Sequence, residues 1–458
     1  MIHPVNRTRI FLASCLALVT MALTFAVRCD ILSALGLEFD LSHQRQGLIL
    51  AAAAWGYPMS ILVVGPFCDH FGMGRLLRIA FVGHVTGILL TLASPALGFP
   101  VLLAACFILS LTEGVVEGVI NPLVATLYPR DKTGRINLLH ASWPLGLVVG
   151  GLFCVAVTAA FRLDVPGVTA AAISLSWRVK FALILLPALG YGFLLVGQPF
   201  PQTERAASGV SMGAMIRETV HPGFLILVVC MAFTAATEMG PDAWLGSVMT
   251  DTVGMRGITF LVYTAVIMFV FRIWAGALVR RYSPFGVLTA SCLLAAGGLF
   301  WLSHAFTPAP AFAAATVFAV GLSLLWPVLL GVATERFPKS GALGLALLSA
   351  TGALGGGLAG PVMGTIYDRY TVRNLPPGVA SLVVVDGRYS PVAKERLDAP
   401  ADLAAVRAAE RAGASMSFRW VSVLPLFPLL VYVPLIFWHR SRGGYRPLRL
   451  SRARPRPR

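Results

Sequence analysis

Charged side chains are scarce in this sequence. Only 12% of its 458 residues are Asp, Glu, Lys or Arg, whereas a typical soluble domain contains about 25%. Hydrophobic residues make up 57% of the chain, and its mean hydropathy is +0.79. This composition excludes an ordinary soluble domain and indicates a membrane protein with several spans.

Motifs for metal binding and catalysis are also absent from the sequence. The seven Cys residues are scattered along the apolar segments without a CxxC pair, and the eight His residues show no HExxH spacing. We therefore expect no disulfide framework, no metal site and no cofactor. Since no nucleophile or metal constellation is present, we expect that the protein is not an enzyme.

The chain contains many long apolar segments. Runs of about 20 apolar residues can cross a bilayer as helices, and we expect twelve, at 10–35, 46–66, 79–97, 101–128, 136–161, 178–198, 222–249, 258–279, 285–305, 310–334, 342–368 and 418–438. The sequence therefore predicts an all-α membrane protein. Arg7 and Arg9 before the first run imitate a signal peptide, but the run continues past Arg28 without a cleavage site, so we expect it to be retained.

The distribution of Lys and Arg predicts the orientation. With both termini cytoplasmic, the inside segments carry 21 of the 36 basic residues, and the short outside loops and their edges carry five. This positive-inside pattern predicts an N-in, C-in protein of the inner (cytoplasmic) membrane. Half of the net charge of +16 comes from eight Arg residues in the tail 439–458. We interpret this tail as a cytoplasmic anchor that touches anionic lipids and expect no binding of nucleic acid.

The chain divides into two halves, residues 1–198 and 222–438, joined by a cytoplasmic connection at 199–221. Three features recur at offsets of 211, 205 and 206, namely Gly65 and Gly276, Pro122 and Pro327, and Gly146 and Gly352. The recurrence favours an internal duplication into two pseudo-symmetric six-helix bundles. Duplicated bundles of this kind bind their substrate between the halves, near the middle of the membrane.

Residues 369–417 form the only long outside segment that we predict. The composition indicates a short strand at Leu382–Val385 and a helix at Ala401–Ala412. The segment could form a small surface cap. We favour the simpler interpretation, a tolerated loop insertion without a role in transport.

Ionisable side chains interrupt several spans. They are Arg28, Asp30, Glu113, Glu117, Glu238, Asp242 and Arg272. An acid at a helix centre in a bilayer costs about 2.5–3.5 kcal/mol, so such residues usually face a cavity and serve it. Because burial disfavours the charged form of a carboxylate, a buried acid can hold a proton and release it when its cavity opens to water. These residues indicate a transport path with proton carriers.

Polar and aromatic residues near these acids suit a sugar. Sugars need planar polar groups for their hydroxyls and aromatic faces for their C–H surfaces, and the candidates are Asn121, Asn137, His140, Trp244 and Trp326. Each also has a structural interpretation. An Asn before a helical Pro can satisfy freed backbone groups, and a single Trp is often a packing residue.

The segment GPFCDHFGMGR at 65–75 resembles the G-x-x-x-D-R-x-G-R loop of the major facilitator superfamily. In that family the Asp lies at a helix end, against the dipole of a facing helix and near an Arg, and latches the inward gate. The resemblance implies these roles for Asp69 and Arg75, with Gly65 and Gly72 at the glycine positions. His70 replaces the usual Arg of the motif.

Within that superfamily the chain resembles the fucose permease group of sugar:proton symporters. The matching residues are Asp30–Leu32, Gln46–Ile49, Glu117, Asn121–Pro122, Asn137–Leu138, His140, Arg272, Arg281–Pro284, Trp326–Pro327, Gly355–Gly357, Pro361–Gly364 and Asp368. The resemblance implies that Asp30 and Glu117 couple protonation to sugar binding. It also implies that His140 takes the place of a Gln that faces the cavity and that Trp326 takes the place of a Tyr beside the sugar, and Trp244 matches a family Trp.

Arg28, Glu113, Glu238 and Asp242 depart from that pattern. We favour a structural ion pair between Arg28 and an acid on the fourth or seventh span. The alternative is that Arg28 or Arg272 binds the carboxylate of an anionic sugar such as a hexuronate, since Arg recognises carboxylates with two parallel hydrogen bonds.

Together these features predict a monomeric secondary transporter that imports a sugar or sugar-like solute with protons. The alternatives within transport are an exporter and an organic-anion carrier. A sensor that transports nothing is less favoured, because we recognise no cytosolic signalling domain in the sequence.

Overall fold

The computed structural model describes residues 5–41, 43–163, 165, 167–253, 257–385, 388–394 and 397–450, and within these ranges the side chains at 43–44, 242–253, 257–258, 385, 388 and 391–392 are not described. In the described part of the chain, twelve helical segments are long and apolar enough to cross a membrane. Each predicted span has a counterpart, with ends that differ by up to eight residues except in the last span. The prediction of an all-α fold with twelve spans is confirmed.

The first half of the chain contains α1 (Arg7–Glu38), α2 (His43–Phe71), α3 (Met73–Leu97), α4 (Phe99–Leu127), α5 (Lys132–His140), α6 (Ser142–Ala160), α7 (Ala170–Ala182) and α8 (Leu185–Leu195). The connection contains α9 (Glu204–Ala207) and α10 (Met212–Thr219). The second half contains α11 (Pro222–Val253), α12 (Gly257–Tyr282), α13 (Pro284–Leu302), α14 (Pro308–Leu322), α15 (Leu325–Arg336), η1 (Pro338–Ser340), α16 (Gly341–Asn374), α17 (Pro377–Val383), β1 (Val384–Val385), β2 (Arg388–Tyr389), α18 (Pro391–Lys394), α19 (Pro400–Ser422), η2 (Leu424–Leu426) and α20 (Leu429–Ser441).

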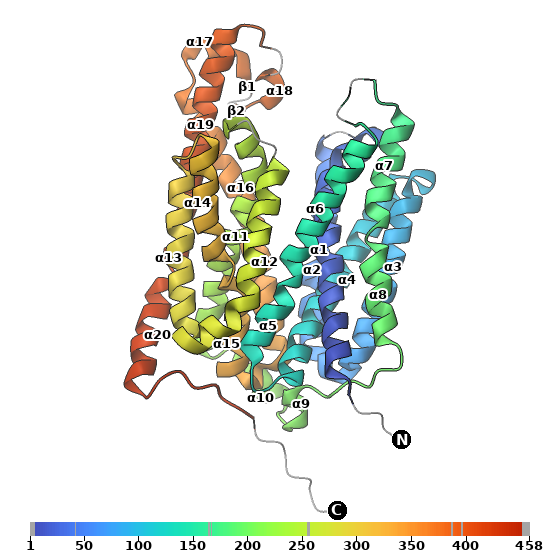
Figure 1. Ribbon diagram of the computed structural model, residues 1–458, viewed down its shortest axis with the longest axis vertical. Coiled ribbons are helices and arrows are strands. Elements are labelled where there is room, and N and C mark those ends of the chain that lie inside the picture. Colours follow the sequence, from blue (N-terminus) through green and yellow to red (C-terminus); the bar gives the residue numbers. More distant parts are fainter. Residues whose placement is uncertain are drawn as a thin grey trace, which may run out of the picture.

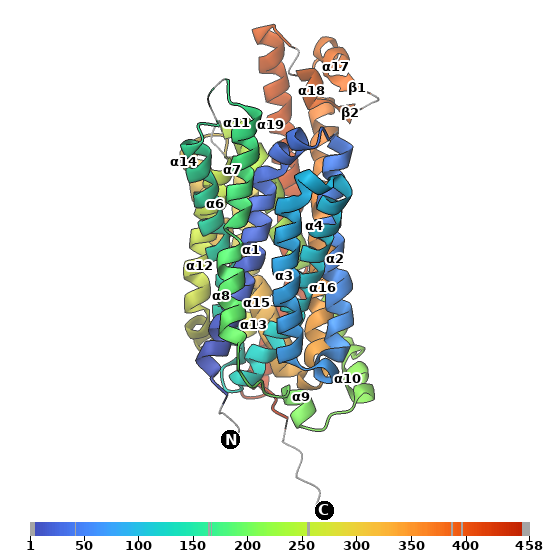
Figure 2. The same cartoon turned by 90° about the vertical axis from the view of Figure 1, so that its right-hand side faces the viewer.

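The helices form two groups that stand side by side. Figure 1 shows α1–α8 in one group and the helices from α11 onward in the other. The start of α1 and the end of α20 lie at one end of the molecule together with α9 and α10, and we call this end the terminal face (Figures 1 and 2). The cap formed by α17, β1, β2 and α18 stands at the opposite end.

Two glycines make one-residue corners between consecutive spans. Gly72 separates α2 from α3 at a φ of 80°, and Gly98 separates α3 from α4 at a φ of 93°. Residues with a Cβ rarely adopt such positive φ angles, whereas glycine adopts them at little cost. These corners let α3 run antiparallel to α2 and α4, which pack against each other.

Two further glycines set the contact between the halves. A Cβ at Gly65 of α2 would collide with the side chain of Ala346 on α16, and a Cβ at Gly276 of α12 would lie 3.3 Å from the Cα of Gly134 on α5. The second span thus crosses the eleventh as the eighth span crosses the fifth. The related contacts support the predicted duplication, and the absence of side chains lets the backbones approach closely.

Most of the segment 369–417 is helical, and the helix predicted at Ala401–Ala412 is confirmed as part of α19. α16 continues to Asn374 and α19 begins at Pro400, and the two helices pack against each other. The predicted strand is correct only for Val384 and Val385, because α17 runs through Val383. Glu410 of α19 holds the cap, since it accepts a hydrogen bond of 2.7 Å from Tyr389 and lies 2.8 Å from Nζ of Lys394.

Candidate functional site

A chain of polar groups begins on α4, near the middle of the membrane span. Glu117 is 4% exposed, and its Oε1 accepts a hydrogen bond of 2.8 Å from Nδ2 of Asn121, one turn further along the helix. The same Nδ2 lies 3.2 Å from the backbone oxygen of Glu117. Pro122 has no N–H, so the helix is locally weakened at this point. Both interpretations of Asn121 therefore apply, because it contacts the backbone and the acid.

His140 continues this chain from α5. Its Nε2 lies 3.0 Å from Oδ1 of Asn121 and 3.7 Å from Oε1 of Glu117. His140 is the last residue of α5, where the fifth span bends into α6, and its side chain is buried. The structure therefore brings three of the predicted site residues, Glu117, Asn121 and His140, into one hydrogen-bonded group.

Arg272 of α12 connects this group to the second half. Its Nη1 donates to the backbone oxygen of His140 at 2.8 Å, and its Nε donates to the backbone oxygen of Ser323 at 2.8 Å. Its Nη2 lies 3.4 Å from Oε1 of Glu238 on α11. With only 2% of its surface exposed, this cation is held by groups of both halves. The geometry makes Arg272 a structural link between the two halves.

Only one of the two carboxylate oxygens of Glu238 contacts Arg272. Its Oε2 is buried without a hydrogen-bond partner among the described residues. An unsatisfied buried polar atom costs about 1–3 kcal/mol, so this oxygen is available to accept a further hydrogen bond. The side chains of Asp242 and Trp244 on the same helix lie outside the described residues.

Arg28 and Glu113 form a second buried group in the first half. Arg28 of α1 is 7% exposed, its Nη1 has no hydrogen-bond partner, and it forms no ion pair with a side chain that the structure describes. Glu113, one turn before Glu117 on α4, interacts with Arg28 electrostatically, while its Oε1 is buried without a hydrogen-bond partner in the described part of the chain. The ion pair that we favoured for Arg28 is therefore not made directly by a described acid.

Two other predicted site residues have structural surroundings. Nδ2 of Asn137 donates to the backbone oxygen of Thr133 at 2.8 Å, while its buried Oδ1 has no partner among the described residues. Trp326 is the second residue of α15 and packs over Gly352 of α16, where a Cβ would collide with its ring. Trp326 is half-buried, so part of its ring is open for other contacts.

Asp30 lies apart from Glu117, in a different environment. Its carboxylate is paired with Nζ of Lys180 on α7 at 2.6 Å, and the same Nζ contacts Oγ1 of Thr158 at 2.8 Å. Lys180 is buried, whereas 28% of the Asp30 side chain is exposed. From the sequence, Lys180 is only a basic residue at the edge of an outside loop. Its pairing with Asp30 could not be predicted, because it requires α1 and α7 to be neighbours.

Asp69 is paired with a residue that the sequence did not indicate. Its Oδ2 accepts a hydrogen bond of 2.6 Å from Nε of Arg205 on α9, and its Oδ1 accepts one from Thr203. Arg75, which we expected beside Asp69, is exposed and lines a neighbouring pocket of about 390 Å³. The expectation for Arg75 as the partner is wrong, because Gly72 turns the chain and α9 comes to lie against the end of α2.

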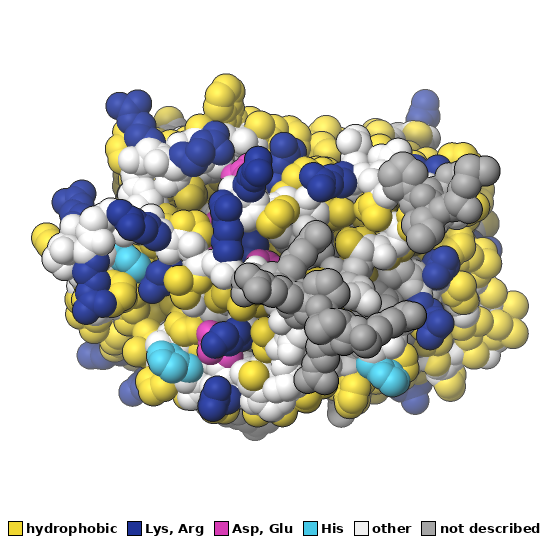
Figure 3. All heavy atoms as spheres, turned by 90° about the horizontal axis from the view of Figure 1, so that it is seen from below, with side chains coloured by type: hydrophobic (Ala, Val, Ile, Leu, Met, Phe, Trp, Pro, Cys, Tyr) yellow, Lys and Arg dark blue, Asp and Glu magenta, His cyan; other side chains and the backbone are white. Residues whose placement is uncertain are grey.

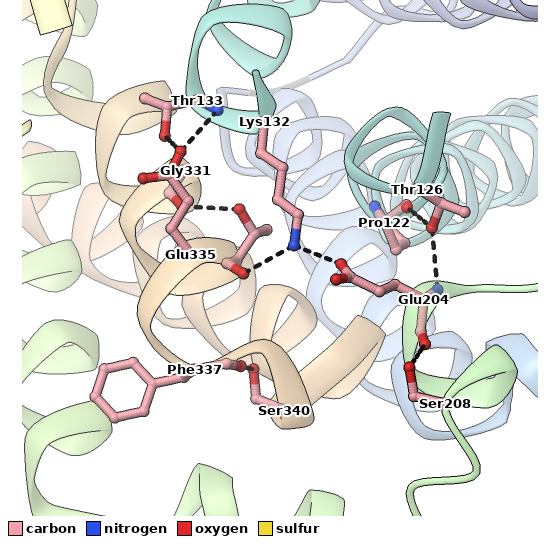
Figure 4. A network of polar contacts seen from close by, with 11 residues as sticks. Pro122, Thr126, Lys132, Thr133, Glu204, Ser208, Gly331, Glu335, Phe337 and Ser340 are labelled. Atoms are coloured by element: carbon pink, nitrogen blue, oxygen red, sulfur yellow. Dashed lines mark hydrogen bonds and ion pairs between the residues drawn. The ribbon is translucent and has the colours of Figure 1, made fainter. Parts of the chain in front are cut away.

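A network at the terminal face joins both halves to the connection (Figure 4). Lys132 of α5 contacts Glu204 of α9 and donates to the backbone oxygen of Thr334 on α15 at 3.3 Å. Oγ1 of Thr133 donates to Oε1 of Glu335 at 2.6 Å. From the sequence, Lys132 is one of the basic residues that predict the orientation of the chain, and no pairing is predicted for it. Glu204 and Glu335, two acids in predominantly basic inside segments, are the feature that could have indicated the network.

The network leaves little open space at the terminal face. The gap between α4, α5, α9, α15 and α16 has a volume of about 30 Å³, close to the volume of one water molecule. Lys and Arg side chains are numerous on this face, and few Asp or Glu side chains are in view (Figure 3). The gap is too small for a solute, so the halves are closed against each other here. The cytoplasmic assignment of this face stays a prediction.

Comparison with known proteins supports one family. The sequence model of the Major Facilitator Superfamily matches residues 10–361. A hexuronate transporter of Bacillus subtilis (strain 168) is 23% identical over 240 residues, which cover 50% of this chain and 53% of that protein. A chloramphenicol resistance protein of Streptomyces lividans is 29% identical over 63% of this chain and 71% of its own length. The chain thus spans about half the length of the first of these relatives.

Two solved structures share the fold. The transporter FucP in the outward conformation has a TM-score of 0.68 at 18% identity, over 91% of this chain and 98% of its own. The proton:xylose symporter XylE bound to 6-bromo-6-deoxy-D-glucose has a TM-score of 0.69 at 17% identity, over 93% of this chain and 96% of its own. Identities this low support the fold alone. With the family match across most of its length, the chain belongs to the Major Facilitator Superfamily and is a multi-pass membrane transporter.

Proposed function

We propose that this transporter imports a sugar or sugar-like solute together with protons by alternating access. The observation that carries the proposal is the continuous polar chain from Glu117 through Asn121 and His140 to Arg272 and Glu238. It runs across the boundary between the halves, where duplicated transporters bind their substrates. Its members supply carboxylates, amide groups, an imidazole and a guanidinium, which are suitable partners for hydroxyl groups.

Glu117 is the proton carrier in this proposal. Its carboxylate has one side-chain hydrogen bond, from Asn121, and is otherwise surrounded by buried groups. When the halves separate and water enters, hydration stabilises the carboxylate form of Glu117 and the proton leaves. Loss of the proton changes the charge next to Asn121 and His140, and Arg272 holds the backbone of His140. Proton release and solute release thereby act on the same hydrogen bonds.

Uptake into proteoliposomes tests this function. The panel contains neutral hexoses, deoxyhexoses and hexuronates, each measured with and without an imposed pH gradient. We expect one class to accumulate above equilibrium only when the gradient is present. Equal accumulation with and without the pH gradient would contradict proton coupling. Preferred uptake of a drug-like cation would contradict the proposed substrate class.

Transport of an organic anion is the second candidate, and Arg28 favours it. Its buried Nη1 has no hydrogen-bond partner among the residues that the structure describes, and a guanidinium suits a carboxylate. A hexuronate would place a carboxylate at Arg28 and its hydroxyls along the chain of polar groups. The hexuronate transporter among the relatives supports this candidate, although it is similar over only half of the chain. In the panel, uptake restricted to hexuronates supports it over neutral sugars.

A further inference from the structure

The tail that follows α20 folds back onto the end of α15. Oη of Tyr445 donates to Oε2 of Glu335 at 2.9 Å, and the backbone N of Leu448 donates to the backbone oxygen of Glu335 at 2.7 Å. Nη1 of Arg336 donates to the backbone oxygen of Arg446 at 3.1 Å. Residues 445–448 are therefore attached to the last turn of α15 by three hydrogen bonds.

The same Glu335 carboxylate reaches the other half of the protein. Its Oε1 accepts hydrogen bonds from Oγ1 of Thr133 at 2.6 Å and from the backbone N of Thr133 at 3.3 Å. The first N–H groups of a helix have no partner within the helix, and this end carries a partial positive charge. Asp131, the residue before α5, makes no side-chain cap. Glu335 therefore caps α5 from the opposite half.

One carboxylate thus connects the tail to the closed terminal face, with Tyr445 on one oxygen and Thr133 on the other. We propose that Tyr445 is a positioning residue of the gate, which fixes the Glu335 carboxylate in the orientation that caps α5. Because the tail already restrains this side chain, less rotational freedom is lost when the gate closes. The docked tail therefore favours the state that is closed at the terminal face.

The surroundings of Tyr445 suit this role. Its ring packs edge-on against Phe285, with centroids 5.8 Å apart, and lies 5.2 Å from the ring of His439. Burial and the neighbouring Glu335 carboxylate raise the pKa of Tyr445 well above its usual value. The phenol therefore keeps its proton and remains a hydrogen-bond donor at neutral pH.

Side-specific labelling of a cysteine in the gap tests the proposal. Ala125, which lines the gap, is replaced by Cys in a chain without the seven native cysteines, and a membrane-impermeant maleimide is added from the side of the terminal face. Tyr445→Phe keeps the ring but removes the hydroxyl, so we expect the labelling rate to rise about three- to tenfold, the effect of one hydrogen bond. Leu448→Pro removes a second tail hydrogen bond and should act in the same direction.

Tyr432→Phe is the matched control. Tyr432 is a buried tyrosine that also packs on Phe285, but its hydroxyl lies beside Cys230 and Thr234 instead of Glu335. We expect its labelling rate to equal that of the parent. An equal rise in this control would show that loss of a phenol near Phe285 is sufficient and would overturn the role of Tyr445.

A double-mutant cycle with Thr133→Ala separates positioning from general stability. Thr133→Ala removes the hydroxyl bond to Glu335 and keeps the backbone N–H bond. If Tyr445 acts through Glu335, its effect on the labelling rate is therefore smaller in this background, so the two changes are not additive. Additive effects, or an unchanged rate in both Tyr445→Phe and Leu448→Pro, would refute the proposal. The assay needs no transported solute, so its result is independent of the proposed substrate.

Discussion

The backbone oxygen of His140 accepts a hydrogen bond of 2.8 Å from Nη1 of Arg272, and the two residues belong to different halves of the chain. The side chain of His140 points to the Asn121 and Glu117 pair, while Arg272 contacts Glu238. Candidate proton and solute groups of one half are therefore in contact with those of the other. Movement of the halves relative to each other must change this contact.

Replacing Glu117 tests proton coupling. Glu117→Gln imitates the protonated acid and retains a carbonyl for Asn121, so we expect solute exchange to continue while accumulation driven by a pH gradient is lost. Counterflow of labelled solute provides the control for a folded and binding-competent protein. Wild-type accumulation under the gradient would show that another residue carries the proton.

Arg272→Gln removes a buried cation that both halves hold. Loss of one partner of a buried ion pair costs about 3–5 kcal/mol because the remaining charge is unpaired. We expect a large fall in thermal stability in detergent, and Arg272→Lys should recover it only in part, since Lys lacks the planar fork. Arg280→Gln is the control, as its contact with Asp131 is exposed. Similar losses in both variants would contradict a special role of Arg272.

Asp69 and Arg205 should act as one unit. Asp69→Asn and Arg205→Gln each weaken the hydrogen bonds between α2 and α9. We therefore expect faster maleimide labelling of a cysteine at position 125 from the terminal face and slower transport turnover. The double variant should resemble either single variant, with a coupling energy of about 1.5–3 kcal/mol for a charge-assisted hydrogen bond. Arg75→Gln is the control and should change little. A larger effect at Arg75 would favour the family pattern over the contacts observed.

Asp30→Asn separates a structural role from a proton-coupling role. It leaves the buried Lys180 without its anion, and we expect a loss of about 1–3 kcal/mol in stability because Asp30 is partly exposed. Adding Lys180→Met should restore much of the stability. If the stable double variant also accumulates solute under a pH gradient, Asp30 is structural. Loss of accumulation at full stability would support the proton-coupling role that the resemblance implies.

Arg28→Gln distinguishes the two substrate classes. If a hexuronate is carried, the substitution should weaken its binding by about 2–5 kcal/mol and spare neutral sugars. If Arg28 instead stabilises Glu113 at a distance, the melting temperature should fall and every solute should be affected alike. Arg178→Gln, which breaks an ion pair with Glu38 near the surface, controls for the loss of a positive charge. Binding by isothermal titration and melting in detergent measure both effects.

The sequence by itself determined the twelve spans and the all-α fold. Continuous apolar runs of bilayer length permit little except helices, since backbone groups in lipid must find partners within their own segment. It also identified Glu117, Asn121, His140, Arg272 and Glu238, because polar side chains in such runs are conspicuous. Their identity was readable without knowing how the helices pack.

Only the tertiary structure decided which of these groups meet. Asp30 pairs with Lys180 and Asp69 with Arg205 because α1 lies beside α7 and α9 returns to the end of α2. The partners are separated by 150 and 136 residues along the chain, and no local pattern encodes such distances. Glu335 was overlooked for the same reason. An acid at a helix end looks ordinary until packing brings Thr133 and Tyr445 to its two oxygens.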